Sequence, residues 1–193
     1  MQKRIFLNND WKFSKKYTAE MREPAFNDHD MENVRIPHTV VVTPFHYFDE
    51  SIYRMISCYR KTVVIDPEWR EKRVFLHFDG VAHTAEVFVN GRPAGTHDCG
   101  YTAFETELTQ FMEHNEDLVI TVRVDSTETQ NVPPFGHVVD YMTYGGIYRE
   151  VWLEVSEPVY IQDVFVRTKL PKNFCFQQGA GAHHEHRDDH RHL

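Results

Sequence analysis

The clearest strand pattern in the chain is Leu118-Val119-Ile120-Thr121-Val122-Arg123-Val124-Asp125. Successive side chains of a β-strand point to opposite faces of the sheet, so residues two apart share a face. The even-numbered residues from Leu118 to Val124 are all apolar, whereas Arg123 and Asp125 lie on the other face. This alternation is typical of a strand that buries one face in an antiparallel sheet.

Other stretches repeat the period of two and are rich in β-branched and aromatic residues. The further strands that we expect are Tyr59–Ile65, Arg73–Asp79, Ala85–Asn90, Glu150–Val155 and Tyr160–Thr168.

Turn residues separate these strands. Asn90-Gly91 between two strand-like flanks predicts a hairpin, because a type I′ turn needs positive φ at both central residues. Asn8-Asn9-Asp10 separates 4–7 from 11–14, which predicts a small N-terminal hairpin. Residues 108–114 could form one or two helical turns, and no other helical pattern is evident.

Short strands without alternating helices exclude a parallel α/β sheet. The sequence therefore predicts an all-β fold, an antiparallel β-sandwich or jelly roll. The length of 193 residues is too small for a (β/α)₈ barrel, which needs about 250 residues.

The amino-acid composition excludes some classes of binding partner. The chain has 29 acidic and 21 basic residues, a formal net charge of -8, which argues against nucleic acid and anionic membranes as partners. No apolar run approaches the roughly 18 residues that cross a bilayer. The first apolar stretch is too short for a signal-peptide core, and three widely spaced cysteines suggest no disulfide framework. We therefore expect a cytoplasmic protein.

The end of the chain differs in composition from the rest. The strand pattern fails near Lys172, a Gly-Ala stretch follows, and five of the 13 histidines lie in the last eleven residues. We expect one domain at 1–170 and a disordered tail at 171–193. Clustered histidines can bind zinc, but a flexible tail offers no closed geometry, so no metal site is predicted there.

Residues with catalytic potential form no catalytic pattern. The chain lacks a Gly-x-Ser-x-Gly elbow and a phosphate-binding glycine loop, and no pair of carboxylates stands out among its many acidic residues. We expect no catalytic residue, no metal and no cofactor. The long segment 135–149 is different, because it is aromatic, contains glycines and precedes a strong strand. Aromatic faces with one carboxylate suit a sugar, although the residues alone favour a structural loop packed by its own aromatic side chains.

An ordered series of short motifs resembles the N-terminal sugar-binding domain of glycoside hydrolase family 2, the β-galactosidases and β-glucuronidases. In order, the motifs are Trp11-Lys12-Phe13, Val34-Arg35-Ile36-Pro37-His38-Thr39, Tyr59-Arg60-Lys61, Leu76-His77-Phe78-Asp79-Gly80-Val81, Ala85-Glu86-Val87-Phe88-Val89-Asn90-Gly91, Gly95-Thr96-His97, Gly100-Tyr101-Thr102-Ala103-Phe104 and Gly145-Gly146-Ile147-Tyr148-Arg149.

The resemblance implies a jelly-roll sandwich of the galactose-binding type, packed in the family on an immunoglobulin-like domain and a catalytic barrel. The barrel carries both catalytic glutamates of the retaining mechanism, so the resemblance implies that this chain alone is inactive. It also implies that sugar is bound in the context of the full enzyme, and the missing partner domains make oligomerisation of this chain an expectation.

One functional residue carries over by resemblance. Family members place an aspartate six residues before the second glycine of the Gly-Gly-Ile-Tyr-Arg motif, where it reaches into the sugar pocket of the barrel. In this chain that residue is Asp140, which is expected to accept hydrogen bonds from sugar hydroxyls. The other matched residues are expected to be structural: Pro37-His38-Thr39 at a loop edge, and Arg149 in a buried or partly buried ion pair.

Two other functions remain open from the sequence. A stand-alone carbohydrate-binding module would bind sugar without further domains. A structural or interaction domain would bind a protein and no sugar.

Overall fold

The computed structural model describes residues 3–46, 49–112, 117–133, 135 and 143–169. Strands and short 3₁₀ helices are the regular elements of these residues. The strands are β1 (Lys3–Phe6), β2 (Trp11–Ser14), β3 (Glu32–Val34), β4 (Ile56–Val63), β5 (Arg73–Phe78), β6 (Thr84–Val89), β7 (Arg92–Asp98), β8 (Phe104–Glu107), β9 (Leu118–Asp125) and β10 (Val151–Ser156). The 3₁₀ helices are η1 (Ala19–Arg22), η2 (Glu50–Tyr53), η3 (Pro67–Trp69) and η4 (Thr109–Phe111).

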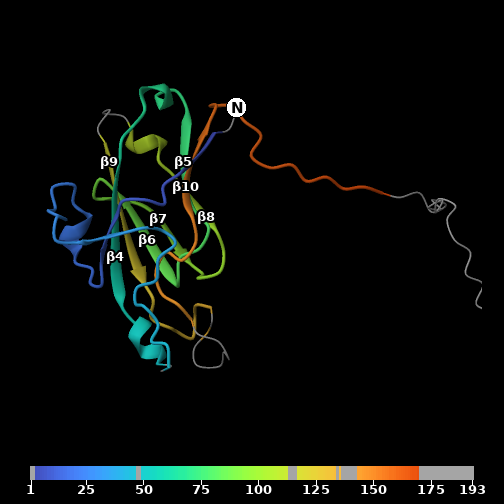
Figure 1. Cartoon of the computed structure of the whole chain (residues 1–193). Helices are drawn as coiled ribbons and strands as arrows, with labels where there is room; N and C mark the ends of the chain where they lie inside the picture. Colours follow the sequence, from blue (N-terminus) through green and yellow to red (C-terminus); the bar gives the residue numbers. More distant parts are fainter. Residues whose placement is uncertain (1–2, 47–48, 113–116, 134, 136–142, 170–193) are drawn as a thin grey trace, which may run out of the picture. The chain divides into compact units, whose positions relative to one another are not determined.

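The strands form two antiparallel sheets that pack as a sandwich (Figure 1). One sheet has the order β1-β10-β5-β8 and the other has the order β3-β2-β4-β9-β6-β7. The predicted all-β, jelly-roll type of sandwich is confirmed. Strand β9 occupies the predicted residues, and the predicted helical turn is confirmed in part as η4.

The predicted Asn90-Gly91 hairpin is also confirmed. Its two central residues have φ of 48° and 76°, and the turn joins β6 to β7. The side chain of Asn90 accepts a hydrogen bond from the backbone N–H of Val119 at 2.8 Å, which ties the turn to strand β9.

The predicted N-terminal hairpin is wrong. Strand β1 pairs with β10 in one sheet, whereas β2 pairs with β3 and β4 in the other. The chain crosses between the sheets at Asn8, whose side chain accepts from the Val151 N–H at 3.0 Å and whose carbonyl accepts from the Ile36 N–H at 2.7 Å. These long-range bonds satisfy the polar groups of the crossing, so a local turn is not needed.

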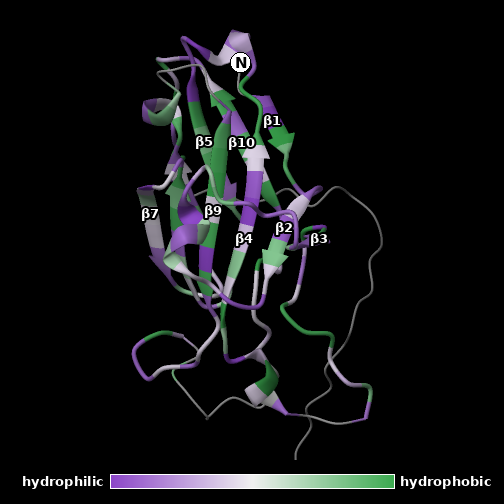
Figure 2. Cartoon of the chain, turned by 90° about the vertical axis from the view of Figure 1, so that its left-hand side faces the viewer, coloured by the Kyte–Doolittle hydropathy of each residue, from purple (hydrophilic) through white to green (hydrophobic). Residues whose placement is uncertain are grey.

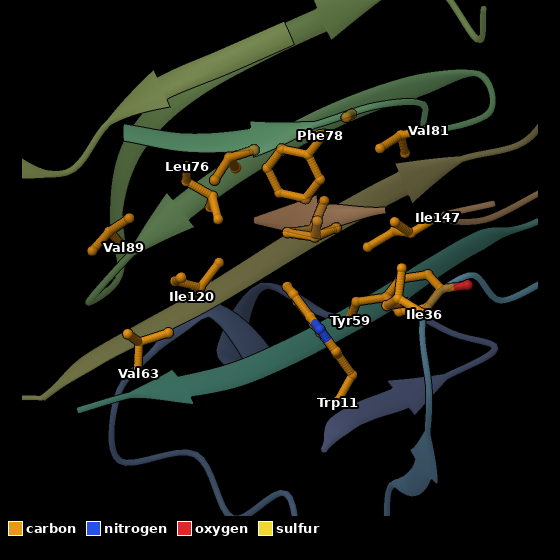
Figure 3. Packing of buried hydrophobic residues seen from close by; sticks show 14 of the residues in the cluster. Trp11, Ile36, Tyr59, Val63, Leu76, Phe78, Val81, Val89, Ile120 and Ile147 are labelled. Atoms are coloured by element: carbon orange, nitrogen blue, oxygen red, sulfur yellow. The ribbon is translucent and has the colours of Figure 1, made fainter. Parts of the chain in front are cut away.

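The core lies between the inner faces of the two sheets. Figure 3 shows Trp11, Tyr59 and Ile120 from the six-stranded sheet and Leu76 and Phe78 from the four-stranded sheet; all five are buried. Each such side chain contributes about 1.5–3 kcal/mol when it leaves water. Figure 2 shows that strands of both sheets mix hydrophobic and hydrophilic residues, as one-sided burial requires.

Arg60 fastens a long connection to the outer face of the six-stranded sheet. Its buried guanidinium donates to the Asp28 carboxylate at 3.1 Å, to Thr121 Oγ1 at 3.2 Å and to the backbone carbonyls of Met21 and Glu23. A buried charge is stable only when its hydrogen-bonding groups are satisfied, so the segment between β2 and β3 and this arginine depend on each other.

Residues 161–169 belong to a second unit, separate from the compact unit that ends at Tyr160. The predicted strand Tyr160–Thr168 is wrong, because no residue of it pairs in a β-ladder within the described ranges. The apolar side chains of Ile161, Val164 and Phe165 are exposed. Residues 160–168 thus have the alternating pattern of a strand, but the described structure has no strand that pairs with them. The predicted domain end at Leu170 and the tail at 171–193 lie outside the described residues, and that boundary stays a prediction.

Candidate functional site

The expected sugar ligand Asp140 lies outside the described residues. The structure does describe the segment that begins three residues later, at Thr143, and leads into β10. This segment contains the Gly-Gly-Ile-Tyr-Arg motif, and its contacts define the site.

The two glycines of the motif lie between two other parts of the chain. On one side the Val40 N–H donates to the Gly145 carbonyl at 3.0 Å. On the other side Gly146 and Ala82 exchange two backbone hydrogen bonds, of 2.9 and 3.2 Å. The 143–149 segment is thus held in place by backbone groups from both the 38–40 loop and the β5–β6 connection.

Both positions require glycine for steric reasons. A Cβ on Gly145 would lie 2.7 Å from Ser126 Cβ, and a Cβ on Gly146 would lie 2.5 Å from the hydroxyl oxygen of Tyr59. Gly146 also has φ of +107°, a conformation that side chains of L-residues disfavour. The motif is therefore a close backbone approach that larger residues would disrupt.

The 38–40 loop is fixed by an aromatic cluster. His38 Nδ1 and the Tyr59 hydroxyl are 2.9 Å apart, and the His38 ring packs edge-on against Phe13 with centroids 4.6 Å apart. Burial lowers the pKa of His38 and raises that of Tyr59, so both side chains are neutral at pH 7. The predicted structural role of Pro37-His38-Thr39 at a loop edge agrees with these contacts and with the His38 N–H donating to the Ile147 carbonyl at 2.8 Å.

A pocket of about 190 Å³, here called the His83 pocket, opens beside the same segment. It joins residues from the β5–β6 connection, the loop before β8 and the 143–149 segment. Its lining residues are Ala82, His83, Gly100, Tyr101, Thr143, Tyr144, Tyr148 and Arg149.

His83 is a buried polar residue of the pocket lining. The residue is 3% exposed, its backbone N–H donates to the Asp125 carbonyl at 3.0 Å, and the peptide bond before it is cis. Burial lowers the pKa of His83 below its usual value, although the charges of Glu128 and Asp125 act in the opposite direction. The imidazole is therefore neutral at pH 7 and can take part in hydrogen bonds as donor and acceptor.

Tyr148 and Arg149 also line the pocket. The Tyr148 hydroxyl donates to the Gly100 carbonyl at 2.5 Å, and burial raises its pKa. The predicted ion pair of Arg149 is wrong: the residue is exposed, and its Nη1 donates to the carbonyls of Asp79 and Tyr101 at 3.4 and 3.3 Å. Among the described residues, backbone carbonyls and not a carboxylate hold this guanidinium beside the pocket.

The first two residues of the 143–149 segment are held by side-chain contacts. The Thr143 hydroxyl donates to Glu128 Oε1, and the other carboxylate oxygen of Glu128, Oε2, lies 3.7 Å from Arg54 Nη2. Tyr144 packs edge-on against Tyr53 with ring centroids 5.7 Å apart. Thr143 and Tyr144, three and four residues after Asp140 in sequence, are thus anchored to two other parts of the chain.

The sequence pointed to part of this site. Tyr101 and Arg149 lie in motifs of the family resemblance and are expected from the sequence to be structural, whereas His83 lies between two of these motifs. Its signal is weak in sequence, since a single histidine at the start of a strand has no spacing that indicates a ligand.

Two further findings concern the described residues alone. No group of three or more His, Cys, Asp or Glu side chains within them could hold a metal ion. None of their helices is both long and apolar enough to cross a membrane.

Comparison with known proteins decides the family. The family model described as "Glycosyl hydrolases family 2, sugar binding domain" matches residues 6–158. The chain belongs to glycosyl hydrolase family 2. Within that family it corresponds to the sugar-binding domain, in agreement with the resemblance seen in its motifs.

Relatives of this family 2 domain include two kinds of glycosidase. A β-galactosidase of Thermoanaerobacter pseudethanolicus is 42% identical over 166 residues, which are 85% of this chain and 22% of that protein. A β-glucuronidase of Bacteroides fragilis is 35% identical over 157 residues, 81% of this chain and 21% of that protein. The chain spans about a fifth of the length of these curated relatives.

Solved structures give the same result for the fold. The crystal structure of a Bacteroides uniformis β-glucuronidase aligns with a TM-score of 0.71 and 28% identity over 81% of this chain and 18% of that one. A putative β-galactosidase from Bacteroides fragilis aligns with a TM-score of 0.65 and 36% identity over 81% of this chain and 23% of that one.

Proposed function

We propose that this family 2 domain serves a β-glycosidase that hydrolyses β-galactosides or related β-glycosides, and that it supplies Asp140 to the sugar. The carboxylate of Asp140 would accept hydrogen bonds from hydroxyls of the non-reducing sugar, in the pocket of a catalytic barrel. The fixed backbone of Gly145 and Gly146 is the observation that carries this proposal. A segment held by backbone hydrogen bonds on both sides is a rigid base for a loop residue that must reach another domain.

The chemistry itself is assigned to the barrel. A retaining glycosidase needs two carboxyl groups about 5–5.5 Å apart, one as acid and one as nucleophile. No carboxylate of this chain is assigned to that pair, so the isolated chain is expected to be inactive. No cofactor is needed for this reaction.

The proposed partners are the barrel and an immunoglobulin-like domain. Exposed apolar residues at 161–166 support a covering partner, because contiguous apolar surface usually marks an interaction site. Without such a partner the same residues favour self-association, so a homo-oligomer of this chain is also proposed. A cytoplasmic location is proposed as well, supported by the free thiols of Cys58 and Cys99 among the described residues, because free cysteines are usual in a reducing compartment.

A chimeric enzyme tests the role of Asp140. Residues 6–158 of this chain would replace the matching segment of the Thermoanaerobacter pseudethanolicus β-galactosidase, the relative that is 42% identical. The chimera is expected to hydrolyse a β-galactoside. Asp140→Ala should lower kcat/KM about 10- to 150-fold, since a hydrogen bond to a charged group contributes about 1.5–3 kcal/mol.

Asp30→Ala is the matched control. Asp30 is a fully exposed aspartate of the same domain, and its ion-pair partner among the described residues is the exposed His29, so its loss should leave kcat/KM unchanged. A folded chimera without activity, or equal kcat/KM for Asp140→Ala and the control, would contradict the proposal.

A further inference from the structure

A buried hydrogen bond joins Glu128 to Thr143. The Thr143 hydroxyl donates to Glu128 Oε1, and the Glu128 side chain is 4% exposed. Thr143 is buried as well. Glutamates are almost never fully buried unless their carboxylate is paired, because removing a charge from water is costly. The contact therefore constrains both residues strongly.

Arg54 supplies the positive charge beside this carboxylate. Arg54 Nη2 lies 3.7 Å from Glu128 Oε2. Arg54 follows directly on the 3₁₀ helix η2, whose last residue, Tyr53, packs against Tyr144. Residues 53–54 thus connect to the start of the 143–149 segment twice, through Glu128 to Thr143 and through a ring contact to Tyr144.

A buried ion pair is a weak source of stability. The cost of taking two charges out of water offsets most of their attraction, and apolar residues of similar volume often stabilise a fold equally well. In some proteins a buried polar pair instead fixes one conformation among several. The burial of Glu128 beside Arg54 is therefore better explained by the arrangement that it imposes than by added stability.

The place of the pair in the sequence indicates which arrangement this is. Glu128 lies three residues after the end of β9, and Thr143 lies three residues after Asp140. The hydrogen bond thus joins the two residues that flank 129–142 in sequence. Three residues of chain span at most about 10–11 Å, so the place where Thr143 is held limits where the residue three positions before it can reach.

We propose that Glu128 is a positioning residue for Asp140: it holds Thr143 and, through Thr143, directs Asp140 towards the sugar. Glu128 itself contacts no sugar, and its role rests on the proposed function of Asp140. A misplacement of about 1 Å can cost about 100-fold in rate even when the substituted residue is far from the reacting atoms. Loss of the hydrogen bond should therefore lower kcat/KM, by no more than the loss of Asp140 does.

The chimeric β-galactosidase tests this role, because the transplanted residues 6–158 contain Arg54, Glu128 and Thr143. Glu128→Met removes the acceptor and keeps a side chain of similar length. It should lower kcat/KM about tenfold, the lower end of the loss expected for Asp140→Ala. Glu128→Gln keeps an oxygen that can accept from Thr143, so its kcat/KM should stay within about threefold of the unsubstituted chimera.

Glu71→Met is the matched control, because Glu71 is an exposed glutamate between η3 and β5 and should leave kcat/KM unchanged. Urea unfolding of the full 193-residue chain with each substitution shows whether the fold survives. If Glu128→Met does not fold, Thr143→Val removes the hydroxyl alone and carries the test. Thr143→Ser keeps the hydroxyl and should retain kcat/KM within about threefold.

A double-mutant cycle separates positioning from general damage to the domain. Glu128→Met should lower kcat/KM about tenfold in the unsubstituted chimera and less than about twofold in the Asp140→Ala chimera, since a residue that acts through Asp140 has no effect without it. An equal loss in both chimeras, or no loss in the first, would overturn the role of Glu128 alone. If Asp140→Ala itself leaves kcat/KM unchanged, the proposed function fails and the role of Glu128 fails with it.

Discussion

Replacing Gly146 by alanine probes the contact that fixes the 143–149 segment. The new Cβ would lie 2.5 Å from the Tyr59 hydroxyl oxygen and 3.0 Å from the backbone carbonyl oxygen of His38. Tyr59 is fully buried among core residues, and the His38 carbonyl belongs to a backbone held by hydrogen bonds. Neither neighbour can move without disturbing the core, so the substitution must strain the segment.

Two effects of Gly146→Ala lower the free energy of unfolding, and they add. A non-glycine residue at φ of +107° costs about 1–3 kcal/mol in backbone strain. Forcing a methyl group into a packed site costs about a further 1–3 kcal/mol. The expected loss in the free energy of unfolding is therefore about 2–6 kcal/mol, a large part of the 5–15 kcal/mol that is typical of a domain.

Gly91→Ala is the matched comparison. Gly91 also has positive φ, +76°, but its Cβ would meet only the carboxylate end of Glu23, 3.0 Å away on a flexible side chain. Both variants carry the strain, and only Gly146→Ala carries the packing cost. Urea unfolding followed by tryptophan fluorescence should show Gly146→Ala less stable than Gly91→Ala by about 1–3 kcal/mol. Equal stability of the two variants would refute the steric reasoning.

Three further results are expected. Arg60→Ala should lower the free energy of unfolding by about 3 kcal/mol in urea denaturation, because carbonyls and a carboxylate lose their buried partner; a loss below 1 kcal/mol would contradict this. Burial lowers the pKa of His77 and His83 in the folded chain, so below about pH 6.5 the unfolded chain binds more protons than the folded one. The melting temperature should therefore fall between pH 7 and pH 5.5, and a rise over this range would contradict the reasoning. Burial raises the pKa of Cys58 to about 12, whereas hydrogen bonds from Thr102 lower that of Cys99; iodoacetamide followed by peptide mass spectrometry should find Cys99 alkylated first, and the reverse order would contradict this.

Local patterns predicted the parts of the fold that depend on neighbouring residues. Strand β9 and the Asn90-Gly91 turn follow from side-chain alternation and from backbone φ preferences, which act over a few residues. The N-terminal hairpin failed because Asn8 is bonded to residues far away in sequence. Residues 160–168 alternate like a strand but have no partner edge in the described structure, and alternation alone cannot supply one.

The candidate site was predictable only in part. Asp140 came from its place in a family motif, and that assignment stays a prediction. Arg149 was expected beside a carboxylate, but the fold brings it to backbone carbonyls, which a sequence pattern does not reveal. The His83 pocket depends on three segments that meet only in the folded chain, so no spacing within the sequence indicates it.

The proposed role of Asp140 is a direct contact with a sugar hydroxyl in a family 2 glycosidase. A double-mutant cycle in the chimeric β-galactosidase measures that contact, using kcat/KM for a β-galactoside and for each of its monodeoxy analogues. One analogue should lose at least tenfold in kcat/KM with Asp140 present and lose almost nothing in the Asp140→Ala chimera, because the contact is already gone. If every analogue loses the same factor in both chimeras, Asp140 contacts no hydroxyl of the sugar and the claim is contradicted.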